Sequence, residues 1–411
     1  MLQSRRTRLC REGWHYLLVL AFVVVGAVSK QVNLLVALAA LMAAPLLFNW
    51  RYVVWSRSRL SVQRRLPHRI AAGDPLVVDL EVRVRGRSPC WSVVVEDSVA
   101  LEGAASPEWQ RSVEAFVPRV APEGPTACSY RCLLTRRGRY RFGPIRVSTR
   151  FPFGLIRGEA ILAQEDTITV FPRLGRLTPR WQHLLDDSVA GVQKANPRRG
   201  LIEGEFYGMR EWRSGDSRRW IHWRTSAKLD QLAVRQFEQQ RTRNLALMLD
   251  LWQDKHPTPR QLENVELAVS LAASAAADLC RRGRGHLALA AAGMSDFYHT
   301  ARASAAQLPV VLERLATVEA GDADKLPELL GRVLDEQPGI GRTIVVSTRP
   351  ARVGQLSASA AWRGNHRRAA ALPRVVWIDV SGDQLPEFFH AEPAIGTVSS
   401  IAPKHGAEDR Q

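Results

Sequence analysis

The chain has 411 residues, enough for two or three domains, and its formal net charge of +17 comes mostly from arginine. This basic balance fits anionic lipid headgroups, nucleic acid, or the arginine preference of a GC-rich genome, and the even spread of arginine favours the last. The five cysteines form no CxxC pair and have no histidine at metal-ligand spacing, which argues against a metal-binding cysteine site and favours buried free thiols in a reducing compartment.

Two uncharged apolar runs, at residues 17–28 and 34–48, are separated by a short polar turn. With the aromatic residues beside them, each run extends to about 16–20 residues, or roughly 24–30 Å as a helix, which just spans a bilayer core. The sequence therefore predicts a transmembrane helical hairpin with basic flanks over residues 1–58. A buried hairpin in a soluble protein is one alternative. A signal peptide cleaved at residues 27–29 is another, against which the second apolar run and its basic tail argue.

The residues that flank the two runs predict their orientation. Four arginines precede the first run and five follow the second, whereas only Lys30 lies in the turn. The positive-inside rule places both ends of the hairpin in the cytoplasm, and the arginines would attract anionic lipid. Aromatic residues flank the runs at one level, as in an interfacial belt: Trp14, Tyr16, Trp50, Tyr52 and Trp55. We therefore expect a multi-pass protein of the cell inner membrane with two helices and a cytoplasmic soluble body.

Alternation of apolar and polar residues begins after the hairpin. Residues 76–86 place four apolar side chains on one face, the pattern of a half-buried strand: Val78, Leu80, Val82 and Val84. Five similar short runs follow, separated by turns that contain glycine or proline. This spacing predicts an all-β sandwich over residues 59–175. A scaffold or interaction role is expected for it, because no catalytic constellation lies in these residues.

Residues 204–239 combine arginines, tryptophans and carboxylates at close spacing. Asp216 precedes a stretch that predicts a short helix with Asp216 as its N-cap, and LAVRQFE after it predicts a strand. Three interpretations remain open. The arginines stack on tryptophans and pair with Glu205, Asp216 or Glu238 in a structural network, or they recognise an anionic or protein partner, or they bind nucleic acid. The last lacks support from any known nucleic-acid motif.

This segment resembles the signature of a bacterial family called domain of unknown function 58 (DUF 58). The matching residues are Gly204 with Glu205-Phe206, Arg210 with Trp212, Gly215-Asp216, Arg219-x-Ile221-x-Trp223, Ala227-Lys228 and Val234-Arg235-Gln236-Phe237-Glu238. Trp212 replaces the usual tyrosine, and Phe151, in a matching stretch upstream, replaces the usual aspartate. The resemblance covers most of the chain, including the hairpin. It marks nine residues as binding or structural candidates: Glu205, Arg210, Trp212, Gly215, Asp216, Arg219, Trp223, Arg235 and Glu238.

The resemblance implies a membrane-anchored protein without an established enzymatic activity. Members of the family often accompany a MoxR-type AAA+ ATPase and a membrane transglutaminase-like protein, which implies a role in assembly or maturation of an envelope-associated complex. We therefore expect a non-enzymatic scaffold or adaptor. Its expected partners are the membrane, the AAA+ ATPase and other membrane proteins, and no nucleic acid or cofactor is expected.

The remaining residues alternate between apolar strands and helices. Strands are predicted at 244–252, 286–293, 343–348 and 374–380, and helices at 261–282, 305–318 and 326–337. The alternation predicts a doubly wound α/β domain over residues 244–385, where family members resemble von Willebrand factor A domains. Residues 176–243 are expected to be a linker that carries the signature, and residues 386–411 a flexible tail.

The A-domain resemblance raises the question of a metal site at the end of the first strand of this domain. Such a site begins D-x-S-x-S, whereas this chain reads Asp250-Leu251-Trp252-Gln253-Asp254. Ser347 and Thr348 end a later strand at the same edge and offer oxygens. Asp250 is therefore a weak metal candidate, expected instead to cap the strand end or to bond local backbone.

Two other functions stay open as alternatives. A divalent-cation-dependent protein-binding domain would need the Asp250 site. A hydrolase is less favoured, because GxGxxG, Walker A, GxSxG and HExxH motifs are absent and His222 has no identifiable nucleophile partner.

Overall fold

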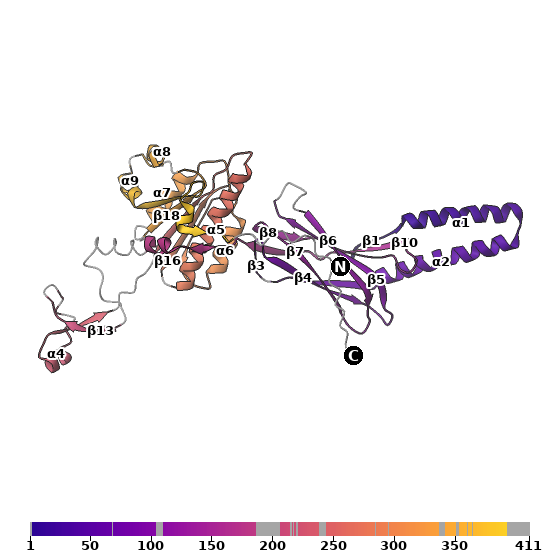
Figure 1. The fold of residues 1–411 in the computed structure, drawn as a ribbon, viewed down its shortest axis with the longest axis horizontal. Helices are drawn as coiled ribbons and strands as arrows, with labels where there is room; N and C mark the ends of the chain where they lie inside the picture. Colours follow the sequence, from indigo (N-terminus) through magenta and orange to yellow (C-terminus); the bar gives the residue numbers. More distant parts are fainter. Residues whose placement is uncertain are drawn as a thin grey trace. The chain divides into compact units, whose positions relative to one another are not determined.

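The chain forms two compact units, the first ending at Phe171 and the second beginning at Pro172. The computed structural model describes residues 2–67, 69–103, 110–185, 206–213, 216, 218, 221–237, 244–283, 285–294, 296–336, 342–350, 353–359, 361–363 and 365–392. The first unit contains a long helical hairpin and two β-sheets, and the second contains a five-stranded sheet with helices on it (Figure 1).

Two helices, α1 (Arg11–Lys30) and α2 (Asn33–Arg57), form the hairpin. Gln31, in the left-handed conformation at φ 50°, turns the chain between them. Both helices are long and apolar enough to cross a membrane, with mean hydropathies of 1.6 and 1.7 in their most apolar stretches. Only 11% and 6% of those stretches are buried within the protein. The apolar side chains thus face outward, unlike those of a core helix in a soluble domain.

The basic segment before the hairpin is a strand and part of a sheet. β1 (Leu2–Leu9) pairs antiparallel with β10 (Ile156–Leu162). The predicted boundary at residue 58 therefore does not separate the hairpin from the β-rich part, since both belong to the first unit. The three arginines of this strand hide its β-character in the sequence, because strands are usually recognised from apolar alternation.

The base of the hairpin is fixed to the β10 region by close backbone contacts. A Cβ atom on Gly13 of α1 would lie 2.2 Å from the carbonyl oxygen of Leu155, and a Cβ on Gly158 would lie 2.3 Å from Val53 of α2. Asn49 of α2 is fully buried, and its side-chain Oδ1 accepts the backbone N–H groups of Leu155 (3.1 Å) and Ile156 (3.0 Å). The hairpin is therefore built into this unit and does not hang from it by a linker.

Two sheets share the core of the first unit. β2 (Leu60–Arg65), β4 (Pro75–Val84) and β7 (Thr126–Leu133) form a three-stranded antiparallel sheet. The other sheet has the order β1-β10-β9-β5-β8-β11-β3, with β6 paired to β5. Its strands not yet given are β3 (Ile70–Ala71), β5 (Cys90–Leu101), β6 (Gln110–Val120), β8 (Gly138–Phe142), β9 (Ile145–Thr149) and β11 (Asp166–Phe171). Buried residues of both sheets form one hydrophobic cluster, and the predicted inward face of residues 76–86 is confirmed.

A buried ion network joins these two sheets. Arg64 of β2 donates to Asp97 of β5 (Nε–Oδ2, 2.9 Å) and to Asp166 of β11 (Nη1–Oδ2, 2.7 Å). Tyr130 of β7 donates its hydroxyl to Asp97 (2.7 Å). Burial and the neighbouring Asp97 raise the pKa of Tyr130, so it stays a neutral donor. Arg64 and Asp97 compensate each other's buried charge and so hold the two sheets in one arrangement. The sequence did not indicate this role.

The second unit is built on a mixed, mainly parallel sheet with the order β17-β16-β15-β18-β19. The strands are β15 (Leu245–Asp250), β16 (His286–Ala292), β17 (Phe297–Arg302), β18 (Arg342–Ser347) and β19 (Val375–Asp379). Only β17, at the edge, runs antiparallel to its neighbour. β15 is buried along its whole length, as expected for a parallel strand covered on both faces. The predicted alternation of strands and helices is confirmed in general, but β17 was missed because its polar residues show little apolar pattern.

The side chains of β15 alternate between two hydrophobic clusters. Leu245, Leu247 and Leu249 lie in one cluster with α5 (Pro259–Arg282) and α6 (Leu308–Thr317), whereas Ala246 and Met248 lie in another with α7 (Leu326–Glu336). Two short helices follow, α8 (Val353–Ala358) and α9 (His366–Ala371). α5 begins with a Thr258–Gln261 capping box and proline at its first position. Helices therefore cover both faces of the sheet.

The limits of the second unit differ from the predicted ones. β12 (Arg176–Leu177) pairs with β20 (Phe389–His390), and α10 (Leu385–Phe388) precedes β20. Trp181 and Phe389 are fully or almost fully buried in the core cluster of α5. Segments expected to be linker (from residue 176) and tail (from residue 386) thus begin inside the fold. They are too short to show periodicity in the sequence, although their large apolar residues complete the core.

All five cysteines are free thiols. Cys90 and Cys280 are buried as predicted, whereas Cys10, Cys128 and Cys132 are only half-buried. Burial raises the pKa of Cys128 to about 11, which keeps this thiol protonated and unreactive near neutral pH.

Candidate functional site

The carboxyl ends of β15 and β18 meet where the order of the sheet reverses. β16 and β17 lie on one side of β15, and β18 and β19 lie on the other. In open α/β sheets ligands bind in the crevice outside the strand ends at this switch point. Asp250 ends β15, Ser347 ends β18, and the two residues are paired in register. The fold therefore points to this edge as the candidate site of the second unit.

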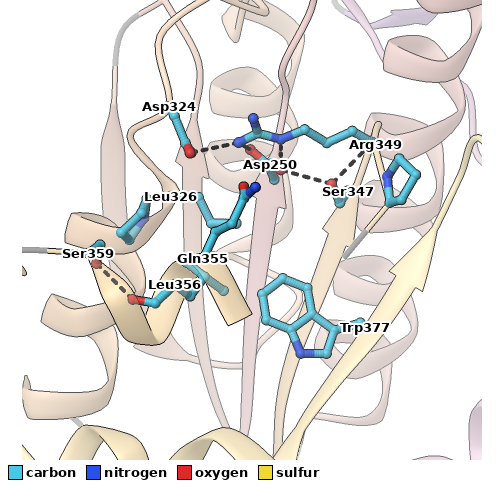
Figure 2. A pocket seen from close by; sticks show the side chains of 11 residues that line it. Asp250, Asp324, Leu326, Ser347, Arg349, Gln355, Leu356, Ser359 and Trp377 are labelled. Atoms are coloured by element: carbon cyan, nitrogen blue, oxygen red, sulfur yellow. Dashed lines mark hydrogen bonds and ion pairs between the residues drawn. The ribbon is translucent and has the colours of Figure 1, made fainter. Parts of the chain in front are cut away.

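Asp250, Ser347, Arg349 and Asp324 form one hydrogen-bonded cluster, which we call the sheet-edge cluster (Figure 2). Arg349 donates from Nε to Asp250 Oδ2 (2.9 Å), and from Nη2 to Asp250 Oδ1 (3.3 Å) and to Asp324 Oδ1 (2.6 Å). Ser347 donates its hydroxyl to Asp250 Oδ2 (2.8 Å). The guanidinium group therefore lies between the two carboxylates and holds both.

The members of the sheet-edge cluster differ in their exposure to solvent. The side chain of Asp250 is 4% exposed and that of Arg349 is 9% exposed, whereas that of Asp324 is 52% exposed. Burial alone would lower the pKa of Arg349, but hydrogen bonds and charge attraction from Asp250 and Asp324 raise it above its ordinary value. Arg349 is therefore always charged. It compensates the buried Asp250 and offers its other side to the exposed Asp324.

A cavity of about 70 Å³ lies beside the sheet-edge cluster. The four members of the cluster line it together with Gln355 and Ser359, and apolar residues make the rest of its wall: Leu326, Pro327, Pro350, Leu356 and Trp377 (Figure 2). At about 30 Å³ per water molecule, this space holds about two waters or one small side chain. Its size suits a protein group better than a cofactor.

The cluster does not fit the predicted role of Asp250. The carboxylate bonds the side chains of Ser347 and Arg349, so the expected strand cap or local backbone bond is wrong. Its position as a metal ligand is taken by the guanidinium of Arg349, which already supplies the positive charge. No group of three histidine, cysteine or acidic side chains able to hold a metal ion occurs among the residues that the structure describes. Sequence reasoning found Asp250 and Ser347 but missed Arg349 and Asp324, since nothing in the local pattern marks two residues that meet only in the fold.

The signature segment forms a β-hairpin that carries a short helix. β13 (Phe206–Glu211) pairs antiparallel with β14 (Ala233–Phe237), and α4 (Trp223–Leu229) lies between them. The predicted strand at β14 is therefore confirmed. Ser226 of α4 is buried, and its hydroxyl accepts the N–H of Ala233 (2.9 Å), which ties the helix to the strand.

Arg210 and Asp216 form the described part of the predicted arginine network. The guanidinium donates to both carboxylate oxygens (2.7 and 2.8 Å), and the backbone N–H of Arg213 donates to Asp216 Oδ2 (2.9 Å). The hydrogen bond from Arg210, followed by that from Arg213, lowers the pKa of Asp216 to about 2. This pair closes the turn after β13, and the choice between a structural and a recognition role for the segment stays a prediction.

The helix of this segment begins later than predicted. Its N-cap is His222, whose Nδ1 accepts the N–H of Thr225 (3.3 Å) and lies 2.8 Å from the Thr225 hydroxyl. Asp216 is not the cap, because Arg210 and Arg213 already occupy its oxygens. The same contact gives His222 a structural role.

Of the other predicted residues of the signature, the structure describes the side chains of Trp212 and Trp223. Trp212 is half-buried and donates its backbone N–H to Leu232 (2.8 Å), and the side chain of Trp223 is 67% exposed on α4. Glu205, Gly215, Arg219 and Glu238 lie outside the described residues, as does the side chain of Arg235.

Three solved structures share a weak likeness with about a quarter of this chain. They are the CARDB domain of a Pyrococcus furiosus protein in complex with di-metal ions (13% identity, TM-score 0.17), a beta-glucosidase from Listeria innocua (12%, 0.20) and the superoxide reductase neelaredoxin from Ignicoccus hospitalis (13%, 0.18). Each match covers 27% of this chain, and covers 91%, 16% and 80% of those chains respectively. Likenesses with TM-scores this low bear on neither fold nor function.

A relative among curated proteins is the uncharacterized protein YeaD of Bacillus subtilis (strain 168). The two are 27% identical over 222 residues, which is 52% of this chain and 51% of YeaD. This chain thus spans about half the length of the curated relative that it matches. The segment with the Arg210–Asp216 pair and the domain with the sheet-edge cluster lie together in residues 208–383, which match the family model described as Protein of unknown function DUF58.

Proposed function

We propose that this chain is a non-enzymatic scaffold or adaptor anchored in the cell inner membrane by α1 and α2, with its soluble body in the cytoplasm. In this proposal the two sheets of the first unit are a β-sandwich support. The second unit is a von Willebrand factor A-like domain that binds a protein partner at the sheet-edge cluster. The observation that carries the proposal is the guanidinium of Arg349, held between a buried and an exposed carboxylate at the switch point of the sheet.

This arrangement favours recognition over catalysis. Asp250 and Arg349 satisfy each other, and the one hydroxyl of the cluster, that of Ser347, donates its proton to Asp250. A nucleophile would need a base to take that proton, and a carboxylate already paired with arginine is a weak base. Asp324, in contrast, is exposed enough to exchange its place on Arg349 with a carboxylate of another protein. Such an exchange replaces one charge-assisted hydrogen bond with another.

The identity of the partner is proposed from the family resemblance. Proteins of that family often accompany a MoxR-type AAA+ ATPase, so we propose such an ATPase as the partner in assembly or maturation of an envelope-associated complex. A carboxylate on the surface of the ATPase would then bind Arg349 and enter the adjoining cavity of about 70 Å³.

The experiment measures binding between the full chain in detergent and a purified MoxR-type ATPase. Asp324→Asn frees Arg349 and should strengthen binding about five- to tenfold, whereas Arg349→Lys loses the two-pronged geometry and should weaken it by at least as much. Glu313→Gln removes an exposed charge from α6 and serves as the matched control without effect. Equal affinities for all four proteins would contradict a partner site at this edge.

A divalent-cation-dependent binding domain is the second candidate. The observation in its favour is that Asp250, Asp324 and Ser347 bring three oxygen donors to one place, even though Arg349 lies among them. Calorimetry with magnesium or manganese decides between the two. Heat of binding at millimolar ion with the wild-type chain would favour the cation-dependent function.

A further inference from the structure

A groove lies in the first unit where α2 leaves its apolar stretch and meets the sheets. It has a volume of about 500 Å³. Its main lining residues are Phe48, Arg51, Tyr52, Trp55, Trp91 and Phe151. The residues from α2 recur at intervals of three and four, so they form one face of that helix.

The walls of the groove are fixed by contacts between the helix and the sheet. The ring of Tyr52 lies 5.2 Å from that of Phe151, and the rings of Trp91 and Phe151 stack at 6.2 Å with 25° between their planes. The Tyr52 hydroxyl accepts the backbone N–H of Trp91 (3.1 Å). Asn49, one turn away, donates to the carbonyl oxygen of Phe151 (2.9 Å). The groove is thus present before any ligand arrives, which lowers the entropic cost of binding.

The groove lies at the end of the apolar stretch of α2, the level at which a membrane-spanning helix reaches the lipid headgroups. Phe48 is the last residue of the predicted apolar run and is 59% exposed, and its ring contacts that of Phe153, which is 53% exposed. Trp50, two residues further along α2, is also half exposed. Exposed aromatic rings at the end of an apolar helix are typical of the headgroup level of a bilayer.

Arg51 lines the groove, and two further arginines lie over aromatic rings of its wall. Arg51 is exposed and forms no ion pair with any residue that the structure describes. The guanidinium of Arg59 lies 4.3 Å from the Trp55 ring, and that of Arg119 lies 5.4 Å from the Trp91 ring. Among the described residues that line the groove, none carries a carboxylate. Cations above an apolar, aromatic floor complement a molecule with an anionic head and a hydrocarbon chain.

We propose that this groove binds one anionic phospholipid of the surrounding bilayer, with the phosphate on Arg51 and one acyl chain against Phe48 and Phe151. The proposal rests on the membrane anchoring proposed above. A bound lipid would fill the space between α2 and the sheets, where the body of the protein meets the membrane surface. Lipids near Arg51 would then be structural partners, beyond the general attraction of basic flanks to an anionic leaflet.

The test uses the full chain, extracted from membranes in detergent, and native mass spectrometry with added phosphatidylglycerol or phosphatidylcholine. One basic residue near an anionic surface contributes about 1 kcal/mol, which corresponds to about a fivefold difference in affinity. The wild type should therefore retain one phosphatidylglycerol about fivefold more tightly than phosphatidylcholine. Arg51→Gln should remove this preference. Arg131→Gln, which removes an exposed arginine of β7 outside the groove, should keep it.

Trp91→Ala tests the apolar wall by itself. Trp91 is 40% exposed, so its removal leaves the core intact and should weaken retention of both lipids. The site is overturned if the wild type shows no preference, or if Arg51→Gln and Arg131→Gln reduce it equally, since diffuse charge would then explain the effect. Extraction of the wild type by alkaline carbonate separates the two proposals. A chain released by carbonate overturns the anchoring and the lipid site together, whereas a chain that stays in the membrane without lipid preference overturns the lipid site alone.

Discussion

Single residues decide how the sheet-edge cluster holds its charge. Asp250 is buried and depends on Arg349 for compensation, and an uncompensated buried carboxylate is costly. Arg349→Met should therefore lower the free energy of unfolding of the second unit by about 3 kcal/mol or more. The double variant Asp250→Asn/Arg349→Met removes both charges and should recover most of that loss, as measured by chemical denaturation of the full chain in detergent. Arg314→Met, at an exposed site on α6, is the control and should stay within about 0.5 kcal/mol.

The same cluster gives a second prediction about cations. In Arg349→Met the two carboxylates and the Ser347 hydroxyl lose their internal cation. Millimolar magnesium should then raise the thermal stability of this variant but leave that of the wild type unchanged. Equal shifts in both proteins would mean that the ion binds elsewhere. No shift in either would mean that the two carboxylates and the hydroxyl cannot form a cation site even without Arg349.

The ionisation of Asp216 should make the stability of the signature segment depend on pH. Its pKa is lowered from 3.8 to about 2 in the folded chain, so it stabilises the folded hairpin above about pH 4 and loses this contribution as the pH falls from 4 to 2. Amide hydrogen exchange in β13 and β14 should therefore be unchanged from pH 7 to 5 after correction for intrinsic rates, and should accelerate below pH 4. Asp216→Asn should show the faster exchange already at pH 7. If β13 and β14 of Asp216→Asn exchange their amides as slowly as in the wild type, Asp216 does not stabilise the hairpin. That result would favour a role in partner recognition.

At the scale of elements, Asn49 fixes α2 to the sheets. Its side chain donates to the carbonyl oxygens of Arg150 (3.5 Å) and Phe151 (2.9 Å) and accepts from Leu155 and Ile156. Asn49→Ala leaves these buried backbone groups without hydrogen-bond partners. Each of the better-formed bonds that is lost should lower the free energy of unfolding by about 1–3 kcal/mol. We expect faster amide exchange at Leu155 and Ile156 and easier proteolysis of the turn at 150–154. Asn33→Ala, at the other end of α2, should change neither.

Elements with a strong periodic pattern could be predicted from the sequence, and elements defined by tertiary contact could not. The alternation at residues 76–86 gave the inward face of β4 correctly, and the two apolar runs gave both helices of the hairpin. β1 and β12 carry arginine in strands that only their partners reveal. The candidate site divides in the same way. Asp250 and Ser347 end recognisable strands, whereas Arg349 and Asp324 reach them from loops whose path depends on the folded sheet.

At the scale of the whole first unit, the pairing of β1 with β10 constrains the membrane topology without any charge rule. β1 precedes α1, β10 follows α2, and the two strands lie in one sheet. The N-terminus and the β-rich part must therefore lie on the same side of any membrane that the hairpin crosses, and only the turn at Gln31 can reach the other side. The flanking arginines likewise predict that both ends lie on one side, and the charge rule alone predicts which side that is.

A thiol-labelling experiment tests this topology in intact cells. Gln31→Cys, at the turn, should react with a membrane-impermeant maleimide added outside, whereas Thr7→Cys in β1 should react only after the cells are permeabilised. The chain with its five natural cysteines is the control, since these are buried or half-buried. Labelling of Thr7→Cys from outside together with protection of Gln31→Cys would invert the orientation but keep the hairpin. Labelling of both from outside would mean that the helices do not span the membrane, because the β1–β10 pairing leaves no arrangement in which one helix crosses alone.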